Sequence, residues 1–295
     1  MKTAMAAVAC AAACLTTTRA QDVFRASVDT VPVSVAVKKG NNAVVGLQAG
    51  DFMLYDNGVL QKVDAVSRED VPIDVSLFVD TSASTAGTLD EMRDSVRKIA
   101  AMLRPNDRFR LLTIGNSVYA PVPWTEAGRP LDAGVHVFGG ISLVLDAVAA
   151  ALLHAVPVGR RHLVVAMTDG MDCGSLVRPG DLQDLAGRTE AVLHWVVMSG
   201  AGGTGGRAVC DQLTEWQYPD VMTEASKRTG GEVHGSPENN PNPVKEFTKV
   251  FDDFRLSYVL QFTPAGVAKS GWHQLRVEVP KGTYRVHARS GYFGG

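Results

Sequence analysis

Residues 74–84 read DVSLFVDTSAS, an apolar run that passes directly into a polar loop. The apolar part is short and nearly continuous, which is typical of a central strand that is covered on both faces. The loop then presents Asp80, Ser82 and Ser84 at a spacing of two residues. That spacing brings the carboxylate and the two hydroxyls to the same side of an extended chain. Because open α/β sheets bind ligands at the carboxyl ends of their strands, this loop is a candidate site.

The chain beyond this loop alternates between helical and strand patterns. A capping box, TLDE at 88–91, opens a helix that the Arg-Pro pair at 104–105 ends. Further strands are predicted at 109–114, 118–122, 163–168 and 191–198, and further helices at 143–156, 213–228 and 244–256. This alternation predicts an α/β fold with a doubly wound, mainly parallel sheet and helices on both faces.

Both ends of the chain carry strand patterns instead. The N-terminal part has an alternating run at 31–37 and the segment DFMLYDNG at 51–58, whose Asp-Asn-Gly predicts a hairpin with a return strand at 59–66. Strand candidates at the other end are 257–263, 274–279 and 284–288. We expect the two ends to pair into one small β domain, into which the α/β domain is inserted. The predicted division is 21–70 and 257–295 for the β domain and 71–256 for the α/β domain.

Composition and the first twenty residues bear on where the protein acts. The chain has 295 residues, of which 45% are hydrophobic and 20% charged, as in folded globular proteins. Residues 1–20 combine Lys2, an Ala-rich apolar run and small residues before Gln21, which predicts a signal peptide and a secreted or periplasmic protein. No later apolar run approaches the ~20 residues that a membrane-spanning helix needs. The net charge of −2 argues against a nucleic-acid partner.

Signal removal would leave two of the four cysteines, Cys173 and Cys210. An oxidising compartment permits a disulfide between such a pair. Both cysteines follow strands that we expect to be neighbours, so a disulfide between them is one hypothesis. The Gly-rich run at 200–206 matches GxGxxG only nominally, because no helix pattern begins in it, and a flexible loop is the preferred interpretation.

Two further polar residues fall at equivalent positions of the predicted sheet. Ser142 follows a Gly-Gly pair at the start of a helix, and Asp169 follows a buried strand in a Thr-Asp-Gly turn. Carboxylate and hydroxyl oxygens suit a hard cation such as Mg²⁺ or Mn²⁺. The alternative is that Asp80 and the serines only cap the next helix, but three such loops at strand-to-helix transitions favour a metal site. Asp172 is interpreted as a solvated turn residue.

These residues resemble the metal-ion-dependent adhesion site of the von Willebrand factor type A domain, which consists of DxSxS, a distant Thr and a distant Asp in a TDG-like turn. Asp80, Ser82 and Ser84 match the first element, and Asp169 matches the last. Ser142 stands where the family usually has Thr, and it lacks the methyl group that restrains the Thr rotamer. The resemblance implies a metal centre in which these side chains bind Mg²⁺ or Mn²⁺, directly or through water.

The resemblance extends to the segments on either side of that domain. Residues 24–37, 51–58, 258–263 and 286–293 look like the flanks of secreted bacterial von Willebrand type A-related proteins that are frequent in acidobacteria. The resemblance thus implies a Rossmann-like von Willebrand type A domain with a small β domain built from both chain ends.

The function that the resemblance implies is a secreted, non-enzymatic interaction module, which binds an Asp or Glu of a protein partner through the cation. Coordination chemistry is consistent with this role, because two carboxylates balance the charge of one divalent ion and leave it able to bind a further anionic oxygen. Two alternatives stay open. One is a metal-dependent phosphoester hydrolase, for which no general base is visible, and the other is a structural envelope protein with a vestigial metal site.

Overall fold

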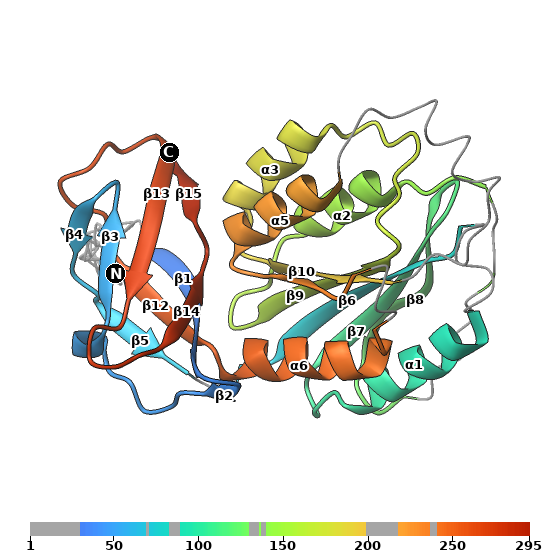
Figure 1. The fold of residues 1–295 in the computed structure, drawn as a ribbon, viewed down its shortest axis with the longest axis horizontal. Helices are drawn as coiled ribbons and strands as arrows, with labels where there is room; N and C mark the ends of the chain where they lie inside the picture. Colours follow the sequence, from blue (N-terminus) through green and yellow to red (C-terminus); the bar gives the residue numbers. More distant parts are fainter. Residues whose placement is uncertain are drawn as a thin grey trace, which may run out of the picture.

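The computed structural model describes residues 30–68, 71–82, 89–129, 136, 140–198, 218–236 and 241–295. Within these ranges the chain forms an α/β domain and a β domain that lie side by side (Figure 1). The predicted signal peptide at 1–20 lies outside the described residues. None of the helices in the described ranges is long and apolar enough to cross a membrane.

The apolar run at 74–80 forms strand β6 (Ile73–Asp80), and every one of its residues is buried. The other strands of its sheet are β7 (Arg108–Ile114), β8 (Val118–Glu126), β9 (Arg161–Thr168), β10 (Val192–Val197) and β11 (Val233–His234). Their order is β11-β10-β9-β6-β7-β8. All neighbours run parallel except β8, which pairs antiparallel with β7. Burial on both faces explains why β6 shows no polar alternation in its central part.

Helices cover both faces of this sheet (Figure 1). One face carries α1 (Leu89–Ala101) and α6 (Pro243–Leu256), and the other carries α2 (Val144–Leu152), α3 (Pro179–Arg188) and α5 (Tyr218–Thr229). Successive residues of β6 alternate between two cores, so that Leu77 packs with α1 and α6 whereas Phe78 packs with α2, α3 and α5. The predicted doubly wound α/β fold is confirmed.

Two helices differ from the prediction. α2 ends at Leu152, four residues before the predicted end at 156. α3 was not predicted at all, because its sequence PGDLQDLAGR holds a Pro and two Gly residues, which are poor helix formers. Its Pro lies in the first turn, where proline is tolerated, and Leu182 and Ala186 are fully buried in the core. Tertiary packing of a narrow apolar stripe therefore stabilises this helix.

The β domain contains two antiparallel sheets, and each combines strands from both ends of the chain. In the first sheet β1 (Val31–Lys39) pairs with β2 (Asn42–Ala43), β12 (Tyr258–Phe262) and β14 (Arg285–Ala288), and β12 also pairs with β5 (Ala65–Ser67). In the second, β13 (Gly271–Glu278) lies between β15 (Gly291–Gly294) and β3 (Met53–Asp56), which pairs with β4 (Val59–Gln61). Val35, Leu54 and Phe262 share its buried core. The predicted pairing of the chain ends is confirmed.

The predicted hairpin is present, but its return strand is shorter than predicted. Asn57 and Gly58 have φ values of 47° and 82°, as a type I′ turn requires. The sequence predicted one return strand at 59–66, whereas β4 ends at Gln61 and the chain then joins the other sheet as β5. The buried side chain of Gln61 donates to the carbonyl of Ala265 (3.0 Å) and accepts its N–H (2.9 Å). These side-chain hydrogen bonds fix the position of the chain where it leaves the second sheet.

Candidate metal centre

The predicted site residues gather where the strand order of the sheet reverses. β6 lies between β7 and β9, so the connections that follow β6 and β9 lead to opposite sides of the sheet. Open α/β sheets bind ligands at such a point, in the crevice outside the carboxyl ends of the two strands. Asp80 is the last residue of β6, and Asp169 follows the last residue of β9. The topology therefore brings the two acidic residues to the same edge of the sheet.

Asp80 is the centre of this group, and donors from three segments hold its side chain. Its exposed fraction is 1%. Its Oδ1 accepts the backbone N–H of Ser82 (3.0 Å), and its Oδ2 accepts the hydroxyl of Thr168 (2.8 Å). The hydroxyl of Ser142 lies 3.3 Å from Oδ1 and 3.5 Å from Oδ2. These contacts place the loop after β6, the start of α2 and the end of β9 around one carboxylate.

Asp169 adds a second carboxylate to the group. Its Oδ1 accepts the backbone N–H of Met171 (3.0 Å), whereas its Oδ2 is buried and has no hydrogen-bond partner among the described residues. Burial, and then the negative charge of Asp169, raise the pKa of Asp80 from 3.8 to about 6. A buried carboxylate oxygen without a partner is unfavourable. Oδ2 of Asp169 therefore has no counter-charge among the described residues.

The residues present fit a divalent cation. A cation between Asp80 and Asp169 would pair with the free Oδ2 of Asp169 and balance both negative charges. The described side chains around Asp80, those of Ser142, Thr168 and Asp169, offer oxygen donors, which suit Mg²⁺ and Mn²⁺. Across the described ranges no three His, Cys, Asp or Glu side chains form a cluster that could hold a metal. A site here would therefore depend on hydroxyl ligands as much as on carboxylates.

Four of the five predicted site residues lie in this group: Asp80, Ser82, Ser142 and Asp169. The fifth, Ser84, belongs to the segment 83–88, which lies outside the described residues. The structure thus brings four of the five predicted residues together, and the roles of all five as metal ligands stay a prediction.

Thr168 is a member of this group that the sequence reasoning did not single out. Its hydroxyl donates to Asp80 and accepts the backbone N–H of Gly170 (3.1 Å). Gly170 has a φ of 85°, a value that favours glycine and turns the chain after the strand. The sequence held a signal for Thr168, because it is the last residue of the buried strand β9. Asp80 is the last residue of the neighbouring strand β6, so the two side chains lie at the same edge of the sheet.

Backbone contacts on both sides position Ser142. Its carbonyl accepts the N–H of Cys173 (2.8 Å), which joins the start of α2 to the loop after β9. The preceding residue, Ile141, donates its N–H to Oδ1 of Asn116 (2.8 Å). Gly140 has a φ of 76°, and a Cβ there would lie 2.2 Å from the same Oδ1. Glycine suits this close approach and the positive φ, and the result is a fixed backbone position for Ser142 beside Asp80.

The interpretation of Asp172 as a solvated turn residue was wrong. Asp172 is 2% exposed, its Oδ2 accepts the N–H of Leu145 (2.8 Å), and its Oδ1 accepts the N–H of Ser175 (3.1 Å). Leu145 lies in the first turn of α2, where N–H groups have no partner within the helix. Asp172 therefore caps α2 from a distant loop, and burial raises its pKa. A local sequence pattern does not reveal this, because the helix that Asp172 caps begins far upstream.

Cys173 is buried and disulfide-bonded. Its predicted partner, Cys210, lies outside the described residues, as does the Gly-rich run at 200–206. The pairing of these two cysteines stays a prediction. The bonded state of Cys173 restrains the loop that carries Asp169 and Asp172.

Comparisons with known proteins bear on the fold. No family model and no curated protein matches the chain. Similar solved structures include the ArnB paralog VWA2 from Sulfolobus acidocaldarius, at 11% identity and a TM-score of 0.47 over 88% of this chain and 75% of that one. A von Willebrand factor type A structure from Catenulispora acidiphila shows 9% identity and a TM-score of 0.45, over 88% and 72%. The manganese-loaded TRAP protein of Plasmodium vivax shows 12% identity and a TM-score of 0.42, over 80% of this chain and 97% of that one.

These TM-scores are all below 0.5, so the fold of the chain rests on its own strand order. The strand order β8-β7-β6-β9-β10-β11, with one antiparallel edge strand and helices on both faces, is that of a doubly wound Rossmann-like sheet. Asp80, Ser82 and the Thr-Asp-Gly turn at 168–170 stand at its switch point. The α/β domain therefore has a doubly wound, Rossmann-like fold, which is the fold class that the sequence resemblance implies.

Proposed function

We propose that the α/β domain binds one divalent cation, Mg²⁺ or Mn²⁺, through Asp80, Ser82, Ser84, Ser142 and Asp169. The observation that carries this proposal is the buried Oδ2 of Asp169, which has no hydrogen-bond partner among the described residues and lies close enough to Asp80 to raise its pKa. The two aspartates supply the charge that balances the ion, and the serines supply neutral oxygens.

The proposed role of the ion is adhesion to a protein partner. A bound cation supplies one chemistry, the coordination of an anionic oxygen from an Asp or Glu of the partner. The chain's own residues prepare the site, because Thr168 orients the carboxylate of Asp80 and the contacts of Cys173 and Ile141 hold Ser142 in place. Both carboxylates are assigned to charge balance, which leaves neither as a general base. We therefore propose an interaction module without enzymatic activity.

Calorimetric titration with Mn²⁺ or Mg²⁺ tests the metal site. The wild-type protein is expected to show saturable binding of one ion. Asp169→Asn retains Oδ1 for Met171 but removes the charge, and should weaken binding about tenfold or more. The control is Asp90→Asn, which changes a side chain on α1 that is 95% exposed and should bind as the wild type does. Equal affinity in Asp169→Asn and the wild type would exclude the site.

Partner capture is tested with the full chain immobilised and exposed to an envelope extract of the producing cells. Proteins retained in Mg²⁺, released by a chelator and not retained by Asp169→Asn would support adhesion through the ion. Retention that is the same with and without chelator would instead favour the structural alternative. Metal-dependent turnover of phosphoesters would contradict the non-enzymatic proposal.

We also propose that the N-terminal segment exports the protein. The bonded state of Cys173 supports this, because stable disulfides form in oxidising compartments. Intact-mass measurement of the protein recovered outside the cytoplasm should show a chain that begins at Gln21. Accumulation of the uncleaved chain in the cytoplasm would contradict export.

A further inference from the structure

The junction of the two domains contains a cavity of about 110 Å³ that is lined by basic side chains. The α/β domain contributes Arg160, Arg161 and His162 at the start of β9, and the β domain contributes Arg289 after β14. The candidate metal centre lies at the other end of β9, beyond Thr168. The cavity is therefore a separate feature of the molecule.

Arg161 spans the junction of the two domains and donates hydrogen bonds to both of them. It donates to the carbonyl of Phe254 (2.9 Å), to the hydroxyl of Ser257 (2.7 Å) and, more weakly, to the hydroxyl of Ser34 (3.4 Å). All three acceptors are neutral oxygens, and within the described ranges its guanidinium forms no ion pair. Burial, followed by the charge of Arg255, lowers the pKa of Arg161 to about 10.

Arg289 is the second buried guanidinium of the cavity, on the β-domain side. Its exposed fraction is 7%, and it donates to the carbonyls of Gly291 (2.8 Å) and Gly187 (2.9 Å). Its Nη1 makes no hydrogen bond to any part of the chain that the structure describes. Glu190 lines the cavity but is exposed and forms no ion pair with Arg289. Burial lowers the pKa of Arg289 to about 10.

The other two basic residues of the cavity, Arg160 and His162, add no unpaired positive charge. Arg160 pairs with the carboxylate of Asp74 (2.5 Å), which is 1% exposed. Burial lowers the pKa of His162 to about 3, so this imidazole is neutral at physiological pH. Within the described ranges, neither Arg161 nor Arg289 forms an ion pair, and the exposed carboxylate of Glu190 offsets the charge of Arg289 only in part. Buried charges in proteins are normally paired, because transfer of an unpaired charge out of water is costly.

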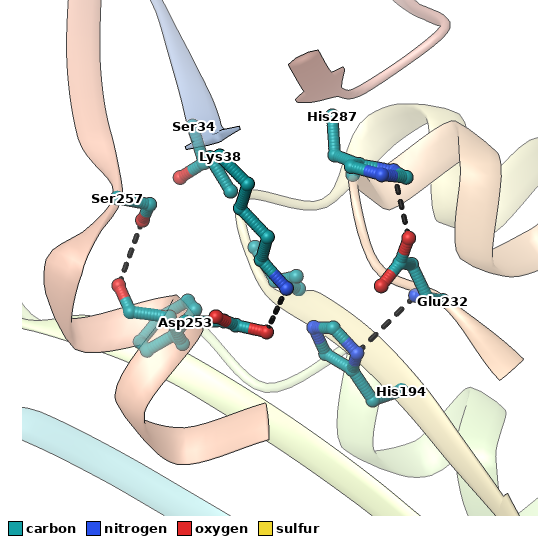
Figure 2. A pocket seen from close by; sticks show the side chains of 11 residues that line it. Ser34, Lys38, His194, Glu232, Asp253, Ser257 and His287 are labelled. Carbon is teal, nitrogen blue, oxygen red and sulfur yellow. Dashed lines mark hydrogen bonds and ion pairs between the residues drawn. The ribbon is translucent and has the colours of Figure 1, made fainter. Parts of the chain in front are cut away.

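A neighbouring pocket at the same junction shows the usual arrangement (Figure 2). It measures about 20 Å³ and shares Ser34 with the larger cavity. There Lys38 faces the carboxylate of Asp253, and Nδ1 of His287 lies 2.8 Å from Oε1 of Glu232. Lys38 and His287 each have an acidic partner from the chain itself. The larger cavity differs because, among the residues that the structure describes, no carboxylate forms an ion pair with Arg161 or Arg289.

We propose that the larger cavity is a binding site for a small oxyanion of the phosphate or sulfate type, held by Arg161 and Arg289. The guanidinium group matches the oxygens of such anions with paired N–H donors. A volume of about 110 Å³ is several times the ~10–15 Å³ that one water molecule occupies on this measure, so a tetrahedral anion fits. Because the two arginines come from different domains, the bound anion would also strengthen the junction between them.

Phosphate binding to the full-length wild-type protein is the primary test. Titration followed by ³¹P NMR and calorimetry, with chelator present and the ionic strength held constant with chloride, should give saturable binding of one ion. Thermal unfolding should shift upward by roughly 2–4 °C at saturating phosphate. Sulfate should compete, whereas acetate, a planar carboxylate, should compete less well. A response that follows ionic strength alone and does not saturate would overturn the proposal.

Variants separate this site from its alternatives. Arg161→Gln and Arg289→Gln should weaken phosphate binding about tenfold or more, and the matched control Arg97→Gln, on the exposed face of α1, should bind as the wild type does. Glu190→Gln removes an exposed negative charge beside the cavity and should tighten binding, so the test does not depend on variants that fold poorly. Asp169→Asn should leave phosphate binding unchanged, because the metal centre is elsewhere. Unaltered affinity in both arginine variants, or weaker binding in Glu190→Gln, would contradict the site.

Discussion

The hydroxyl of Thr168 lies 2.8 Å from Oδ2 of Asp80 and joins the carboxyl ends of β9 and β6. The two residues are neighbours because the parallel register of these strands pairs Val79 with Met167, one position earlier. The other oxygen of Asp80 accepts the N–H of Ser82. Both oxygens are therefore oriented by the chain, which is the kind of support that a precise ligand site needs.

Replacement of Thr168 by Val tests this support. The change keeps the shape of the side chain but removes the hydroxyl, so the buried carboxylate of Asp80 loses one donor. We expect a loss of about 1–3 kcal/mol in the free energy of unfolding, measured with urea in the presence of chelator, and a weaker affinity for Mn²⁺. Thr168→Ser keeps the hydroxyl and should recover most of both properties. A Thr168→Val protein with wild-type stability and affinity would show that the bond is unimportant.

Replacement of Ser142 by Thr restores the residue that the resemblance leads us to expect. The added methyl group restricts the χ1 rotamer, which lowers the entropy lost when the hydroxyl is fixed on an ion. Reduction from three staggered rotamers toward one predicts about threefold tighter metal binding. Calorimetry on Ser142→Thr, with Ser142→Ala as the comparison, measures the effect. If Thr binds no better than Ala, Ser142 is not a ligand.

Removal of the cap that Asp172 provides should destabilise the start of α2. Asp172→Ala leaves the N–H groups of Leu145 and Ser175 without this acceptor, and a cap of this kind contributes about 0.5–2 kcal/mol. We expect that loss in urea unfolding, together with weaker metal binding, since Ser142 precedes the same helix. Asp172→Asn retains one acceptor oxygen and should show a smaller effect. Equal stability of all three proteins would argue against the capping role.

Two buried histidines predict how stability depends on pH. Burial, helped by the charges of Arg110 and His234 respectively, lowers the pKa of His162 and of His194 from 6.5 to about 3. The unfolded chain therefore binds more protons than the folded chain between pH 6.5 and 3. Their contribution to stability is complete above pH 6.5 and is lost as pH falls toward 3, by about 2 kcal/mol for each histidine between neutral pH and pH 5.

Urea unfolding of the wild type across pH 5–8 in chelator measures this dependence. Replacement of His162 by Gln should make the curve less steep below pH 6.5, whereas replacement of the exposed His136 by Gln should leave the slope unchanged. A wild-type curve that is flat over this range would contradict the assignment of neutral, buried imidazoles.

The α/β fold and the hairpin of the β domain could be predicted from the sequence because their signals are local. The apolar run at 74–80, the capping box at 88–91 and the Asn-Gly turn at 57–58 each act over a few residues, so hydrophobic period and turn chemistry reveal them. The same holds for the polar residues that follow β6 and β9, since strand ends in such sheets lie at one edge. α3 was not predicted because its residues have a low helix propensity, and its packing against distant segments of the core stabilises it instead.

The sequence by itself determined which side chains stand at the carboxyl ends of the strands, and with them the chemistry of the candidate metal centre. Only the tertiary structure decided that β9 lies beside β6, that Asp172 caps α2, and that Arg161 and Arg289 meet in one cavity. Hydrogen-bond partners, burial and charge balance arise between segments that are distant in the chain, and no local pattern specifies them.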